Sequence, residues 1–474
     1  MNSRSIRGMI LTFAASCAML LAAPALRAQQ DATPSTGQGG DQASAPGGQS
    51  APGPVGGVEA YRFPGSTLGH SFIVPRLSLQ EVYDTNAGYS ATSSASQGDA
   101  ITTLTGGVSL QWLKRNSTLS LDYDTAGLIY NTQEQPNGLV QHLGVTEKVT
   151  LRRWNLLFGE NFSYSPNSIF GLGGLGYLGN TTGLGLGGVT GFNPSQIPTQ
   201  TIVSPNVSQF SSASAFQAQY FINGSSSVNG SVIVGFLHFF GDELLNTRTI
   251  SARIGYDRSF SPRDTISLSY LATLLDYPSG IPGFTSHYIQ LGYRRILTGR
   301  LQLTVSAGPS ISQFTPMTGQ TTVPGGTTVV DLALFSSLDY KLRDGALSAQ
   351  YTHSVGGGSG YFVGSITDQF TGNFSRHLTR VVSGRLSGGY ARNESLQQTS
   401  GVTGNTQSSF NTWFAGGSIS RPIGHYSSIS FAYNASRQTS NTTMCANMLA
   451  CGPIALVQVI GVTFNWSTRP FKLE

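Results

Sequence analysis

Residues 116–131 read Asn-Ser-Thr-Leu-Ser-Leu-Asp-Tyr-Asp-Thr-Ala-Gly-Leu-Ile-Tyr-Asn, a segment in which apolar and polar side chains alternate. Successive side chains of a β-strand point to opposite faces of the sheet. One face of the segment therefore collects Leu119, Leu121, Tyr123 and Ile129. The other face collects Ser120, Asp122, Asp124 and Ala126. A strand with one apolar and one charged face is what a wall between lipid and water requires.

Segments with the same period-two alternation follow one another along the chain from about residue 72, separated by turn-forming residues. They predict eighteen strands, an even number, at 72–84, 101–113, 116–131, 139–152, 154–165, 207–221, 227–240, 245–260, 264–276, 285–297, 299–314, 327–342, 345–358, 362–377, 379–393, 408–421, 425–438 and 455–468. Sixteen strands are the alternative count, because the seventh and thirteenth links are short.

The connections between these strands alternate in length. Short links such as Lys114-Arg115 and 223–225 follow the even-numbered strands, whereas most links after odd-numbered strands are longer, including 85–100, 166–206 and 439–454. Short turns on the periplasmic rim and long loops on the outer rim are typical of outer-membrane barrels. The sequence thus predicts an all-β fold, a transmembrane antiparallel up-and-down β-barrel with both termini in the periplasm.

Composition excludes a soluble globular protein and a helical membrane protein. Charged residues make up 10% of the chain, against about 25% in soluble globular domains. No apolar stretch after residue 28 approaches the about 20 residues of a membrane-spanning helix. Because Arg4, Arg7 and Arg27 account for three of the five net positive charges, we predict no nucleic-acid partner. No spacing of His, Asp and Ser indicates catalysis, so we also predict no enzyme and no cofactor.

The chain divides into three predicted regions. Residues 1–28 have the charged start, the apolar run Met9–Ala23 and the small residues of a signal peptide. Residues 29–70 are rich in Gly, Ser, Pro and Gln, with too few apolar side chains to fold, so we expect a disordered periplasmic leader. Residues 71–474 form the predicted barrel.

Two short segments resemble known outer-membrane barrels. Gly461-Val-Thr-Phe-Asn-Trp466 is similar to the terminal strand by which such barrels are presented to the barrel assembly machinery. Val74-Pro-Arg-Leu-Ser-Leu-Gln-Glu-Val-Tyr-Asp-Thr-Asn86 resembles the opening strand of porin-like barrels found with exopolysaccharide export systems. The resemblance implies the outer membrane and an export role, and it carries no residue-level function.

The polar face of the strands is expected to line a water-filled lumen, since charged side chains inside a barrel require water. These side chains either form a channel that tolerates anions and sugars or make cross-strand ion pairs that stiffen the wall. The predicted pore-lining residues are Arg76, Asp122, Asp124, Lys148, Arg152, Arg253, Asp257, Arg294, Asp331, Asp339, Lys341 and Arg385.

The link 166–206 is far longer than an ordinary loop and repeats Leu between glycines in residues 171–190. We expect this part to fold into the lumen as a constriction or to pack on a partner; the alternative is an exposed outer loop. Cys445 and Cys451 are six residues apart in another long link and are predicted to form a local disulfide, because exported chains meet an oxidising compartment. No metal site is predicted at them.

Two glutamates interrupt the apolar faces of neighbouring strands. If Arg153-Trp154 is the turn between these strands, Glu147 and Glu160 lie directly opposite each other on the lipid side. Two carboxylates in this position predict that at least one is protonated or is covered by a protomer or an accessory protein. A β-bulge that turns one of them inward is the alternative.

Together these features predict an outer-membrane pore or export conduit for hydrophilic solutes, with saccharides as a narrower reading. The alternative is a structural or adhesive barrel that acts through its outer loops. The expected partners are outer-membrane lipid, the assembly machinery, and either further copies of the chain or a component of an export system.

Overall fold

The computed structural model describes residues 71–90, 95–132, 137–166, 202, 207–240, 244–278, 281–314, 328–396, 399–401, 404–406, 408–441 and 453–473. All eighteen predicted strands are confirmed, and the bounds of two, 72–84 and 154–165, match residue for residue. The elements are β1 (Phe72–Asp84), β2 (Asp99–Leu113), β3 (Ser117–Tyr130), β4 (Gly138–Thr150), β5 (Trp154–Ser165), β6 (Gln209–Asn223), β7 (Ser226–Phe239), β8 (Thr247–Ser259), β9 (Asp264–Tyr277), β10 (Ile281–Thr298), β11 (Leu301–Phe314), β12 (Thr328–Lys341), β13 (Gly345–Gly356), the short 3₁₀ turn η4 (Gly358–Gly360), β14 (Ser365–His377), β15 (Ser383–Ser395), β16 (Thr399–Gly401), β17 (Gly404–Thr406), β18 (Ser409–Pro422), β19 (Ser427–Ser440), β20 (Ile454–Ser467) and β21 (Phe471–Lys472).

The strands form one closed antiparallel sheet. Each wall strand pairs with the next one along the chain, and β1 pairs with both β2 and β20, which closes the barrel. β21 continues the last strand beside β1, and β16 and β17 form a separate hairpin in a long link. In the described part of the chain the wall therefore has eighteen strands, not sixteen. Among the described residues, no helix is long and apolar enough to cross a membrane.

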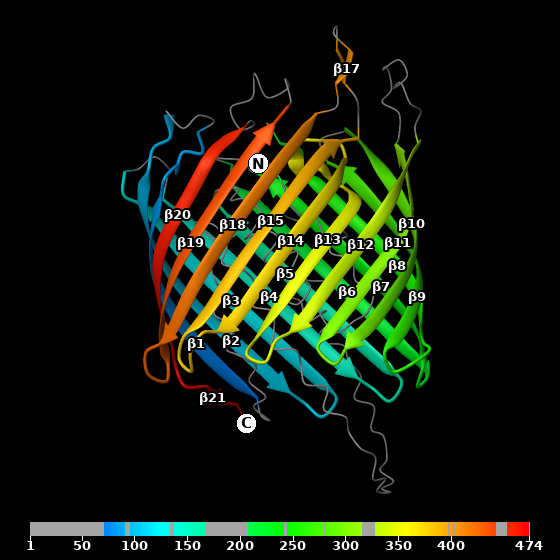
Figure 1. The fold of residues 1–474 in the computed structure, drawn as a ribbon, viewed down its shortest axis with the longest axis horizontal. Coiled ribbons are helices and arrows are strands. Elements are labelled where there is room, and N and C mark those ends of the chain that lie inside the picture. The colour runs from blue at the N-terminus through cyan, green and yellow to red at the C-terminus, as the bar shows by residue number, and fades with distance from the viewer. Residues whose placement is uncertain are drawn as a thin grey trace, which may run out of the picture. The chain divides into compact units, whose positions relative to one another are not determined.

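The two rims differ as predicted. The links after even-numbered strands in the first half are tight turns, as in the Leu151 to Trp154 turn, which a backbone hydrogen bond of 2.7 Å closes. These turns and the C-terminus lie at the lower end in Figure 1, and the β16–β17 hairpin extends from the upper end. We call the two ends the short-turn rim and the long-link rim.

The outer surface of the barrel is apolar. Leu77 and Leu79 of β1 are 47% and 50% exposed, whereas Arg76 and Ser78, which alternate with them, face the lumen. Outward aromatic side chains border this apolar band near both rims, as expected for a transmembrane barrel. They include Trp112, Trp154, Tyr426 and Trp466 toward the short turns and Tyr83, Phe370, Tyr390 and Trp413 toward the long links.

The expected pairing of Glu147 with Glu160 is wrong. The turn between β4 and β5 is Arg152-Arg153, one residue earlier than expected, so Glu147 pairs with Phe158 and Glu160 pairs with Val145. The β4–β5 ladder has no register shift, so no bulge turns either carboxylate inward. Both remain on the outer face, two residues out of register.

Candidate functional site

The inner wall carries the predicted pore-lining residues. Directly opposite residues of paired antiparallel strands lie on the same face of the sheet. The residues paired with Arg76 and with the other inward residues of β1 therefore face the lumen. The structure places on the inner face Asp122, Asp124, Lys148, Arg253, Asp257, Arg294, Asp331, Asp339, Lys341 and Arg385. Arg152 is a correction: it lies in the β4–β5 turn and is exposed at the short-turn rim.

Arg76 braces three strands on the inner wall. Its guanidinium donates from Nε to Asp124 Oδ1 at 2.8 Å and from Nη2 to Asp124 Oδ2 at 2.5 Å, and Nη1 lies 3.4 Å from Asp122 Oδ1. Gly107 of β2 lies between them, and a Cβ there would stand 2.1 Å from Asp124 Oδ1. The glycine thus leaves the space that lets β1 reach β3. The alternation of the strands predicts these charges on one face but does not predict this ion pair.

Charge is distributed unequally along the barrel axis. Toward the short-turn rim, the inner wall carries the cations Lys148, Arg294, Lys341 and Arg385 and two acids, Asp257 and Asp339. The turns of that rim add Lys114, Arg115, Arg152, Arg153, Arg263, Arg300, Arg343 and Arg380, against Asp344. Toward the long-link rim the inner wall presents Asp84, Asp99 and Asp331.

Neutral hydroxyl and amide groups cover much of the remaining inner wall. Hydroxyl pairs bridge neighbouring strands, such as Ser251 with Thr273 at 3.0 Å and Ser286 with Ser312 at 2.7 Å. Asn229 donates to Asp257 Oδ2 at 2.6 Å. Such a surface offers donors and acceptors to a hydrated solute.

The link between β13 and β14 lies inside the barrel at the long-link rim. We call residues 357–364 the crossbar. Leu245 donates its N–H to the Gly360 carbonyl at 2.8 Å, and a Cβ on Gly360 would stand 2.6 Å from the Phe239 ring of β7. Gly360 and Gly364 have φ angles of 85° and 80°, which side chains rarely adopt. The glycines therefore let the crossbar turn tightly and approach the opposite wall.

The crossbar extends from one side of the lumen to the other. Tyr361 packs against the buried cluster around Phe239 and also against Phe410 of β18, with ring centroids 5.4 Å apart. Phe362 packs on Phe410 at 5.7 Å and on Ile202 of the long fifth link. β7 is the seventh and β18 the sixteenth of the eighteen wall strands, so nine steps separate them in either direction. The crossbar is therefore a constriction at the long-link rim.

Two inward tyrosines hold the crossbar and the strand that leads into it. Tyr277 of β9, which is 1% exposed, accepts the Gly364 N–H at 2.9 Å and donates to the Gly357 carbonyl at 3.4 Å. Tyr288 of β10 donates to the Val355 carbonyl at 3.1 Å. Val355 also packs against Phe284. These contacts join the β13–β14 hairpin to the inner wall three and four strands away.

The wall is incomplete behind the crossbar. β12 pairs with β11 along thirteen residue pairs but with β13 along only eight, and that ladder ends at Leu334 and His353. Beyond this point, in the described chain, residues 328–333 have no ladder partner on the β13 side. We call this interruption the seam.

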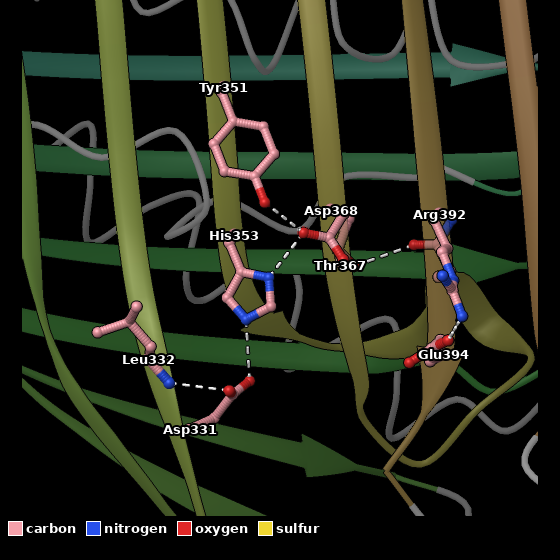
Figure 2. Close-up of polar contacts among 9 residues, drawn as sticks. Asp331, Leu332, Tyr351, His353, Thr367, Asp368, Arg392 and Glu394 are labelled. Carbon is pink, nitrogen blue, oxygen red and sulfur yellow. Dashed lines mark hydrogen bonds and ion pairs between the residues drawn. The ribbon is translucent and has the colours of Figure 1, made fainter.

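A polar cluster lies at the end of the seam (Figure 2). His353 Nδ1 lies 2.7 Å from Asp368 Oδ1, its Nε2 lies 3.2 Å from Asp331 Oδ2, and Tyr351 donates to Asp368 at 2.6 Å. His353 and Asp368 belong to the outward-facing residues of their strands, whereas Asp331 faces the lumen. Their contact shows that β13 lies on the inner side of β12 here. Among the described residues, no group of His, Cys, Asp and Glu could hold a metal ion.

The long-link end of the lumen is also apolar on the β1–β4 side. Ile101 and Leu128 are 1% exposed and cluster with Val82, and Tyr89 of the first link packs against them. Burial raises the pKa of the Tyr89 phenol well above its ordinary value. The first link thus also enters this end of the barrel.

Four sequence-based predictions lie outside the described residues: the segments 1–28 and 29–70, the Gly-Leu segment 171–190, and the pair Cys445 and Cys451. The constriction that the structure does describe is formed by residues 357–364, which the sequence analysis missed. The signal was present in Gly356-Gly-Gly-Ser-Gly-Tyr-Phe362, an unusually glycine-rich link with two aromatic residues.

No protein-family model and no curated protein matches the chain. Solved outer-membrane structures are similar to it. OccAB3 of Acinetobacter baumannii is 8% identical, with a TM-score of 0.45, over 85% of this chain and 100% of that one. OpdQ of Pseudomonas aeruginosa is 9% identical, with a TM-score of 0.42, over 85% and 99%. The outer membrane protein OpdK of the same species is 10% identical, with a TM-score of 0.42, over 84% and 99%.

Proposed function

We propose that the chain is an outer-membrane pore that passes hydrophilic solutes through its barrel. The observation that carries this proposal is the closed wall of eighteen strands, apolar outside and lined inside by charged, hydroxyl and amide groups. Barrels of this size enclose an aqueous channel. The membrane lipid contacts the outer face between the two aromatic borders.

The short-turn rim faces the periplasm in this proposal, because short turns occupy that side in outer-membrane barrels. β1 begins at this rim and the C-terminal β21 ends there. The basic inner wall above the rim, with Lys148, Lys341 and Arg385, attracts anions from the periplasmic side. Anionic or neutral saccharides leaving the cell are the solute class that suits this wall.

Reconstitution into planar bilayers tests the pore. We expect steady single-channel conductance from the wild type or, where the crossbar keeps the lumen closed, from a variant in which residues 357–363 are replaced by a short Gly-Ser turn. Absence of conductance from both proteins, each inserted and folded, would contradict the proposal.

The second candidate is a structural or adhesive barrel that remains closed. The crossbar, which joins Phe239 to Phe410 across the lumen, favours it. It predicts that even the variant without a crossbar conducts no ions, so the same experiment separates the two functions.

A further inference from the structure

The interrupted seam between β12 and β13 suggests two states of the barrel, and the state with the crossbar in the lumen is one of them. We propose that the outer ends of β13–β15 form a gate, which swings back into the wall, extends the β12–β13 ladder and withdraws the crossbar from the lumen. This inference rests on the proposed pore function.

The hairpin lies inside the barrel, as its contacts show. Val355 and Ile366 alternate with the lumen-facing residues of β13 and β14, and so belong to the outward set. Yet both pack with Leu275 and Phe284, which face the lumen from β9 and β10. An outward face can meet the inner face of other strands only if the hairpin has folded inward.

The gate moves as a piece of sheet rather than as a loop. β13 and β14 stay paired to Gly356 and Ser365, and β14 and β15 stay paired to Ser365 and Ser395. Leu396 continues this pairing by donating its N–H to Gly364. Only the ladder to β12 is interrupted, so the seam is where the gate separates from the wall.

The register of the seam permits it to close. The eight pairs from Lys341–Ala346 to Leu334–His353 have no shift. Continuing the same register brings Ala333 opposite Ser354 and Leu332 opposite Val355. No residue needs to be inserted or looped out for the wall to become continuous.

Side chains replace the missing ladder bonds in the folded-in state. Asp331 accepts the Leu332 N–H at 2.8 Å. Tyr288 donates to the Val355 carbonyl at 3.1 Å. An exchange of one set of hydrogen bonds for another has a small net free energy. The two states can therefore lie close in free energy, which is what a switching element requires.

Disulfide trapping tests the gate. In a background carrying Cys445→Ser and Cys451→Ser, the pair Ala333→Cys/Ser354→Cys is oxidised in lipid-inserted protein. The matched control is Ser337→Cys/Gln350→Cys, a lumen-facing pair in the part of the same ladder that is already formed. We expect both disulfides to form, and the 333–354 disulfide to raise single-channel conductance severalfold while the 337–350 disulfide leaves it unchanged.

Formation of the control disulfide without the 333–354 disulfide would overturn the proposed gate. A 333–354 disulfide that forms in a conducting protein and leaves its conductance unchanged would overturn it as well. Formation of the 333–354 disulfide in a protein that never conducts supports the movement and overturns the pore, so the two proposals fail separately. Heat-modifiable electrophoretic migration establishes that each variant is folded. Tyr288→Phe, which removes the bond to Val355 without adding atoms, should speed 333–354 disulfide formation and leave the control rate unchanged.

Discussion

At the scale of the residue, the lumen is organised by a few side chains whose partners lie on distant strands. Arg76 reaches past β2 to Asp124 through the space above Gly107, and Tyr277 reaches the two ends of the crossbar. Asp124 is 1% exposed, so it depends on Arg76 for its charge compensation. Removing one partner of such a pair is costly because the other charge remains buried.

Arg76→Met should therefore lower the free energy of unfolding by about 3 kcal/mol. Urea titration of the protein in lipid vesicles measures it. The control is Lys148→Met, which replaces an exposed cation on the same inner wall and should change stability by less than about 0.5 kcal/mol. Equal effects of the two substitutions would contradict a brace at Arg76.

Tyr277→Phe tests the hydroxyl that holds the crossbar. The variant loses the bonds to Gly364 and Gly357, each worth about 1 kcal/mol. Every 1.4 kcal/mol is a factor of about ten in an equilibrium, so the open fraction should rise about tenfold or more. Single-channel open probability measures this open fraction. An unchanged open probability would mean that the Tyr277 hydroxyl does not hold the crossbar in place.

Sequence reasoning was sufficient to assign side chains to the two faces of a strand. Alternation placed Arg76, Asp122 and Asp124 on the lumen side correctly, because the side-chain period of a strand is a local property. Alternation cannot show that Arg76 chooses Asp124 across an intervening strand. That choice depends on Gly107, whose role appears only when three strands are side by side.

At the scale of the element, a hairpin's register depends on its turn. The error in the Glu147–Glu160 pairing came from placing the turn one residue late, at Arg153-Trp154 instead of Arg152-Arg153. Shifting the turn by one residue moves every pair by two and leaves the faces unchanged. The sidedness was therefore predicted correctly while the contact was not.

Glu160 is a buried carboxyl group on the apolar outer face. It is 8% exposed and accepts from Ser212 at 3.3 Å, and its Oε2 has no hydrogen-bond partner in the described structure. Glu160→Leu should stabilise the barrel by about 2 kcal/mol, because a polar group at the lipid face is costly.

The urea midpoint measures this stabilisation, with Glu147→Leu on the neighbouring strand as the comparison. Native electrophoresis of the double variant shows whether the same surface holds copies of the chain together. An intact oligomer with both glutamates replaced would exclude the interface that the sequence analysis predicted at this position.

The crossbar is the element that glycine makes possible. Gly360→Val forces a branched side chain onto a φ of 85° and into the Phe239 ring. The variant should displace the crossbar and raise ion conduction, as Tyr277→Phe should by raising the open probability. Gly372→Val is the control, since a Cβ at Gly372 of β14 meets nothing within 4 Å. An equal response of both variants would mean that conductance reports general damage to the wall.

At the scale of the whole molecule, the charge of the inner wall differs between the two ends of the barrel. Basic side chains dominate the inner wall at one end, and Asp84, Asp99 and Asp331 lie toward the other. The pore-lining residues predicted from the sequence include both signs of charge, and sequence order does not show their height along the barrel. The ladder registers separate the charges by height and so give the lumen a direction.

Replacing Lys148, Arg294, Lys341 and Arg385 together by Gln should abolish the preference for anions. The reversal potential in a salt gradient measures it: the wild type should favour the anion, and the fourfold variant should shift toward zero or toward the cation. Arg258→Gln, at an outward cation of β8, is the control and should leave the reversal potential unchanged. A wild type without ion preference would remove the argument for an anionic solute.

The crossbar has a consequence for the cell that carries such a barrel. An open tube of eighteen strands would let small toxic molecules enter in proportion to the number of copies made. A barrel that is obstructed by its own chain separates abundance from leakage, so a cell can hold many copies ready at little risk. Permeability then becomes a matter of timing, set by whatever moves the ends of β13–β15 at the long-link rim.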